Sequence, residues 1–117
     1  MAYRLRAPIP AGTWHLVGDG YLIMGTIDVR FDIIWRTAAK QDTVLAMVTH
    51  TFAERPAPTQ GDAVAFETDL IGIAANARAG DELVLKFTVT RGDNNGNYTP
   101  NGDGPFAKGR YPNLTLP

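Results

Sequence analysis

Apolar and polar residues alternate with a period of two along much of this chain. The clearest example is residues 27–36, where aspartate and arginine occupy the intervening positions. The apolar positions there are Ile27, Val29, Phe31, Ile33 and Trp35. This pattern predicts a strand with one face buried and one face in water. Ile34 is the exception, because it falls on the polar face, where it could cover an edge or contact a partner.

The same alternation predicts further strands. Residues 43–52 place Val44, Ala46, Val48 and Phe52 on one face, with Leu45 and Met47 among threonines on the other. Residues 64–70 and 83–89 alternate in the same way, and shorter strands are expected at 13–17, 21–24 and 114–116. Turns are expected at Gly18-Asp19-Gly20, in the loop 56–61 and at Ala79-Gly80-Asp81.

No window shows sustained helical spacing, so about seven or eight short strands are expected, with frequent turns between them. The predicted fold class is all-β, a two-sheet antiparallel sandwich of jelly-roll-like type. A single β-sandwich domain is expected to cover residues 1–117. The segment from Ala79 to Leu85 resembles the Gly-Asp turn and aliphatic strand of many jelly-roll domains. That resemblance covers a few residues and implies a fold only.

Composition narrows the function classes. The chain has 117 residues, 44% of them hydrophobic and 20% charged, which is enough for a hydrophobic core. The net charge of −1 provides no field to attract nucleic acid. No apolar run is long enough to span a membrane, and no signal peptide is recognisable. The expectation is a soluble protein of unknown localisation, which could be particle-associated or extracellular by a non-classical route.

Candidate catalytic groups are few. Cysteine and serine are absent, which removes disulfides, thiolate metal sites and the usual nucleophiles. His15 and His50 are the only histidines, and their spacing fits no zinc motif. The twelve acidic residues leave a carboxylate pair open as a third hypothesis. The prediction is therefore that the protein is not an enzyme and needs no cofactor, with calcium as the exception considered next.

Residues 91–105 are rich in glycine, asparagine and aspartate. These residue types favour turns, so a long structured loop is one interpretation. The other is a weak calcium site, because calcium prefers carboxylate, amide and carbonyl oxygens. The candidate ligands are Asp93, Asn95, Asn97, Asn101 and Asp103. Their spacing does not match the helix-flanked calcium loop. The calcium hypothesis predicts a higher melting temperature in millimolar calcium.

Two function hypotheses follow. The leading one is a non-catalytic structural or interaction domain that forms homo-oligomers or decorates a larger assembly or surface. Its candidate interface residues are Leu45, Met47, Phe106 and Tyr111. The alternative is a carbohydrate-binding module, with or without calcium. Its candidate stacking platforms are Trp14, Tyr98 and Tyr111.

Overall fold

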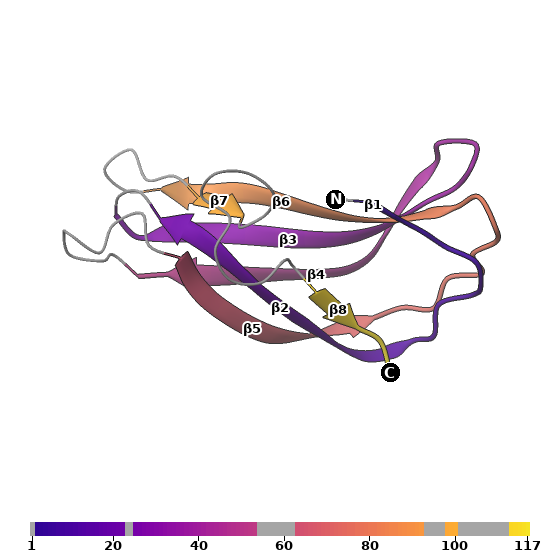
Figure 1. The fold of residues 1–117 in the computed structure, drawn as a ribbon, viewed down its shortest axis with the longest axis horizontal. Coiled ribbons are helices and arrows are strands. Elements are labelled where there is room, and N and C mark those ends of the chain that lie inside the picture. The colour runs from indigo at the N-terminus through magenta and orange to yellow at the C-terminus, as the bar shows by residue number, and fades with distance from the viewer. Residues whose placement is uncertain (1, 23–24, 54–62, 93–97, 101–112) are drawn as a thin grey trace.

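The computed structural model describes residues 2–22, 25–53, 63–92, 98–100 and 113–117, and these form two antiparallel sheets (Figure 1). The first sheet has the order β1 (Ala2–Arg4), β6 (Glu82–Gly92), β3 (Ile27–Arg36) and β4 (Asp42–Phe52). The second has the order β5 (Ala63–Gly72), β2 (Gly12–Leu22) and β7 (Tyr98–Pro100), and β8 (Asn113–Thr115) also pairs with β2. The predicted two-sheet antiparallel sandwich is confirmed.

The strand pairs are nested around the β3–β4 connection. β3 pairs with β4, β2 pairs with β5, and β1 pairs with β6, all antiparallel. Successive pairs alternate between the two sheets, as they do when a long hairpin is wound into a jelly roll. The winding brings β6 beside β3, which places residues far apart in sequence in one continuous sheet face.

The core lies between the inner faces of the two sheets. Val29, Phe31 and Ile33 of β3 are buried there, as the alternation predicts. They share a core with Leu16 of β2 and Phe66 of β5. Fully burying an aliphatic or aromatic side chain of this kind contributes about 1.5–3 kcal/mol. This shared burial therefore holds the two sheets together.

The predicted turn at Gly18-Asp19-Gly20 is wrong. These residues lie within the single strand β2, where they pair with Phe66, Ala65 and Val64 of β5. The two short strands expected at 13–17 and 21–24 are therefore parts of one strand as far as Leu22. Glycine and aspartate are unfavourable in strands, but strand propensity depends on context, and here pairing with β5 satisfies their backbone groups and outweighs it. β1 and β7 are short strands that the alternation did not predict.

A β-bulge in β4 corrects the predicted faces of that strand. Ile33 pairs with Ala46 and Ile34 pairs with Val44, so Leu45 is the extra residue. Leu45 and Ala46 both point into the core, with exposed fractions of 3% and 5%. Val44 lies on the outer face instead of the inner one, and Leu45 lies inside instead of outside.

Asp81 ties two loops to the core at the start of β6. Its carboxylate accepts hydrogen bonds from the Trp35 indole Nε1 at 2.9 Å and from the backbone nitrogens of Ala38 and Arg78, each at 3.0 Å. The backbone bond from Arg78, followed by the Trp35 bond, lowers the pKa of Asp81. The Gly-Asp turn expected from the sequence is thus held by its own aspartate.

Candidate interaction surface

The outer face of the first sheet carries a row of apolar side chains that crosses all of its strands. Strand register places Ile34 of β3 beside Val44 of β4 and Val84 of β6, and Val84 beside Ala2 of β1. We call these four residues the apolar row. Val44 is 48% exposed, whereas Ile34 is 8% exposed because its neighbours cover it. The alternation of β3 predicts that Ile34 lies on this outer face, and the structure confirms that prediction.

A row of alternating charges lies next to the apolar row. It runs across the strands from Asp42 through Arg36 and Glu82 to Arg4, with signs minus, plus, minus, plus. Arg36 donates to both oxygens of Asp42, from Nε at 2.8 Å and from Nη2 at 2.9 Å. This two-bond contact lowers the pKa of Asp42 and raises the pKa of Arg36. We call these four residues the charged row.

Polar and charged residues continue on the other side of the apolar row. Asp32 pairs in register with Met47 of β4 and Lys86 of β6. Asp32 is 5% exposed and accepts a hydrogen bond from Arg30 Nε at 2.9 Å. Met47 is 56% exposed, the most exposed apolar side chain described on this face. This face therefore combines an apolar row with ordered, paired charges.

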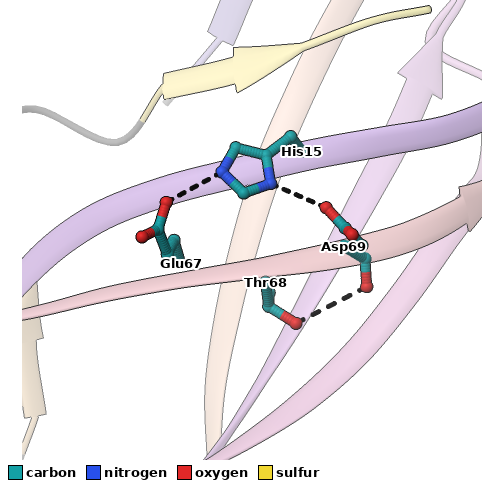
Figure 2. Close-up of polar contacts among 4 residues, drawn as sticks. All are labelled: His15, Glu67, Thr68 and Asp69. Atoms are coloured by element: carbon teal, nitrogen blue, oxygen red, sulfur yellow. Dashed lines mark hydrogen bonds and ion pairs between the residues drawn. The ribbon is translucent and has the colours of Figure 1, made fainter.

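The outer face of the second sheet carries a histidine held between two carboxylates (Figure 2). His15 Nδ1 lies 2.7 Å from Asp69 Oδ1, and His15 Nε2 lies 3.0 Å from Glu67 Oε2. Both ring nitrogens donate only when the imidazole is protonated. The Asp69 contact, followed by the Glu67 contact, raises the pKa of His15. In this arrangement His15 has no free lone pair to accept a proton or bind a metal.

His50 lies on the inner side of β4, as the alternation predicts. Its ring centroid is 4.6 Å from that of Phe52 and 5.4 Å from that of Phe66. Burial lowers the pKa of His50, so its neutral form is favoured. The two histidines therefore point to different sides of the fold. Among the described residues, no three of the histidines, aspartates and glutamates are grouped to hold a metal ion.

A cavity of about 270 Å³ opens between the two sheets near β1 and β8. Its described lining is aliphatic apart from Tyr3. The lining residues are Tyr3, Leu16, Ile33, Leu83, Leu85, Leu114 and Leu116. Because Tyr3 is 47% exposed, the cavity opens to the surface beside β1 and is an apolar pocket, not a sealed void.

The structure separates the predicted interface residues. Met47 lies exposed on the outer face of the first sheet, as the interface hypothesis requires. Leu45 does not, because the bulge turns it into the core. Phe106 and Tyr111 lie outside the described residues. Sequence reasoning missed Val44 because strict alternation across the bulge assigned it to the core.

The carbohydrate hypothesis loses one of its stacking platforms. Trp14 has an exposed fraction of 0% and donates from Nε1 to the Pro10 carbonyl at 3.2 Å. The prediction that Trp14 stacks on a sugar is therefore wrong. The backbone of Tyr98 belongs to β7, but its side chain and all of Tyr111 lie outside what the structure describes.

The candidate calcium ligands cannot be placed. Asp93, Asn95, Asn97, Asn101 and Asp103 all lie outside the described residues. The calcium site remains a prediction, and an unchanged melting temperature in millimolar calcium would dispose of it.

Comparison with known proteins does not assign this chain to a family, because no family model and no curated protein matches its sequence. Within the described residues, the structure contains no helix long and apolar enough to cross a membrane.

Proposed function

We propose that this chain is a non-catalytic assembly domain, which associates with copies of itself or with a larger particle through the outer face of its first sheet. The observation that supports this proposal is the apolar row. A solvent-facing sheet surface ordinarily carries polar residues, and a continuous apolar row across a whole sheet is typical of a covered surface.

The exposure of the side chains on this face gives association a driving force. Val44 and Met47 are 48% and 56% exposed, so covering them removes apolar surface from water. Full burial of such side chains contributes about 1.5–3 kcal/mol each, and partial burial contributes a fraction of that. The neighbouring charges are already paired within the sheet, which limits the cost of bringing a partner close.

The described histidines support a non-catalytic interpretation. General base catalysis needs an imidazole nitrogen that can accept a proton from a bound substrate. Both nitrogens of His15 are occupied by carboxylates, and His50 is packed against phenylalanine rings.

Sedimentation equilibrium over a wide concentration range tests the proposal. The wild-type chain should form a discrete oligomer, and Val44→Lys should weaken it. Ile71→Lys is the matched control, because Ile71 is 76% exposed but lies on the outer face of the second sheet. A wild-type chain that stays monomeric at high concentration would contradict self-assembly.

A further inference from the structure

We infer that the partner on this face is a second copy of the chain, related by a two-fold axis that runs parallel to the strands between β3 and β6. This inference rests on the proposed function and names the partner and its geometry. Strand register fixes how residues are distributed over this face, and that distribution matches a two-fold axis.

A two-fold axis of this kind turns the sheet over while it preserves position along the strands. It places β6 of one copy over β3 of the other, and β1 over β4. Each row therefore meets the same row of the partner in reverse order. Such isologous pairing requires a surface that is complementary to itself.

The charged row meets this requirement. Its signs run minus, plus, minus, plus, so its reverse places a positive group over every negative one. Arg36 faces the partner's Glu82, and Asp42 faces the partner's Arg4. The requirement is that the outer two charges of the row are opposite in sign and that the inner two are as well, and both pairs meet it.

The other rows agree with the same axis. In the apolar row, Ile34 faces the partner's Val84 and Val44 faces the partner's Ala2. In the next row, Asp32 faces the partner's Lys86. Apolar groups thus meet apolar groups and opposite charges meet, so complementarity extends along the face.

The perpendicular two-fold axis fits less well. An axis across the strands reverses position along them. Centred on the apolar row, it places Ile34 over the partner's Ile34 and Arg36 over the partner's Asp32, but it covers the exposed Met47 with the carboxylate of the partner's Asp42. The axis parallel to the strands avoids that contact, and charge reversal separates the two geometries because Arg36 faces the partner's Glu82 only with the parallel axis.

The size of the face is sufficient for a weak dimer. With strands about 4.8 Å apart and outward residues about 6.8 Å apart, and because β1 (Ala2–Arg4) reaches only the charged and apolar rows, the part of the face that lies under a partner strand is roughly 450 Å² per copy, or about 900 Å² in the pair. Interfaces of this size lie below the usual range of stable complexes, where associations are transient. We expect a dimer whose population depends on protein concentration.

Charge reversal in trans tests this geometry. Arg36→Glu and Glu82→Arg each create two like-charge contacts in the symmetric dimer, because the two-fold axis repeats the contact. Each variant alone should weaken dimerisation on the order of 100-fold, since each like-charge contact costs about a factor of ten or more. A one-to-one mixture should form a heterodimer with an affinity within about tenfold of wild type, because both contacts become opposite in sign.

The control and the outcomes are distinct. Glu67→Arg makes the same charge change on the second sheet and should leave the dimer unchanged. Thermal unfolding of each variant shows whether it is folded. If the wild type dimerises but the mixture stays as weak as either variant, this geometry is wrong and the assembly function stands. If the wild type remains monomeric, the proposed function itself fails.

A cross-linking experiment covers the case in which a charge variant does not fold. The chain contains no cysteine, so Ala2→Cys and Val44→Cys introduce the only thiols. Within one chain these positions lie three strand spacings apart, about 14 Å. A shorter thiol cross-linker should therefore join two chains in this geometry. The double variant of Ala2→Cys and Ile71→Cys should give no covalent dimer. A double variant of Ala2→Cys and Val44→Cys that cross-links no better than this control would overturn the inference.

Discussion

Gly72→Ala should destabilise the fold strongly, although it adds only one methyl group. A Cβ built at Gly72 falls within the indole ring of Trp14. Trp14 is fully buried, and its Nε1 is bonded to the Pro10 carbonyl at 3.2 Å, so the ring cannot move without loss of that bond. Strand β5 must therefore shift or the indole must leave its place.

The expected cost follows from these contacts. Overpacking of a well-packed core costs about 1–3 kcal/mol. Loss of the Trp14 hydrogen bond adds about 1 kcal/mol. The total of about 3 kcal/mol is a large part of the roughly 6–17 kcal/mol expected for a domain of this length. Urea unfolding, with the m-value checked for each variant, measures the change.

A double-mutant cycle with Trp14→Leu tests the cause. Trp14→Leu alone should cost about 2–4 kcal/mol because it leaves a cavity. In the double variant the methyl group of Gly72→Ala fills part of that cavity. The double variant should therefore lose at least about 1 kcal/mol less stability than the sum of the two single losses. Ile71→Thr, on the opposite face of β5, is the control and should change stability by less than about 0.5 kcal/mol. Additive costs, or a cost for Gly72→Ala below that of the control, would refute the reasoning.

Further predictions concern pH and packing. Because burial holds the pKa of His50 below its usual 6.5, its contribution to stability is complete above that pH and falls as pH drops below it. His50→Gln should flatten this acid slope of the melting temperature. The pH dependence that His15 gives to stability has the opposite sign. Because the pKa of His15 is raised in the folded protein, its contribution to stability is complete below pH 6.5 and is lost as pH rises through the raised pKa. His15→Gln should therefore flatten the fall of the melting temperature on the neutral side of the profile. Asp81→Asn should lower the melting temperature at neutral pH. The difference between variant and wild type should begin to shrink as pH falls below 3.8 and should continue to shrink as pH falls through the lowered pKa of Asp81. Leu116→Phe should fill part of the cavity of about 270 Å³ and raise stability in urea unfolding by about 0.5–1 kcal/mol; lower stability would show that the cavity does not accept a larger ring.

The fold class was predictable because alternation is a direct record of which face of a strand is buried. β3 shows this best, since Val29, Phe31 and Ile33 are all in the core. Position 72 shows what alternation omits. Nothing in the sequence indicates that Gly72 lies against Trp14, because that contact depends on how β5 pairs with β2. The exposure expected for Trp14 failed for the same reason.

The interaction surface was only partly predictable, and the β4 bulge explains why. Before the bulge the outer residues of β4 are Asp42 and Val44. After the bulge they are Met47, Thr49 and Thr51. A strand without the bulge would turn either Val44 or Met47 inward, so both could not lie on one face. The bulge therefore brings Val44 into line with Ile34 and keeps Met47 beside it. Deletion of Leu45 would shorten β4 by the extra residue and leave Val44 and Met47 two positions apart, so both would stay on the outer face. Such a variant should lose stability with the buried Leu45 side chain but keep its association wherever it folds, which sedimentation equilibrium measures.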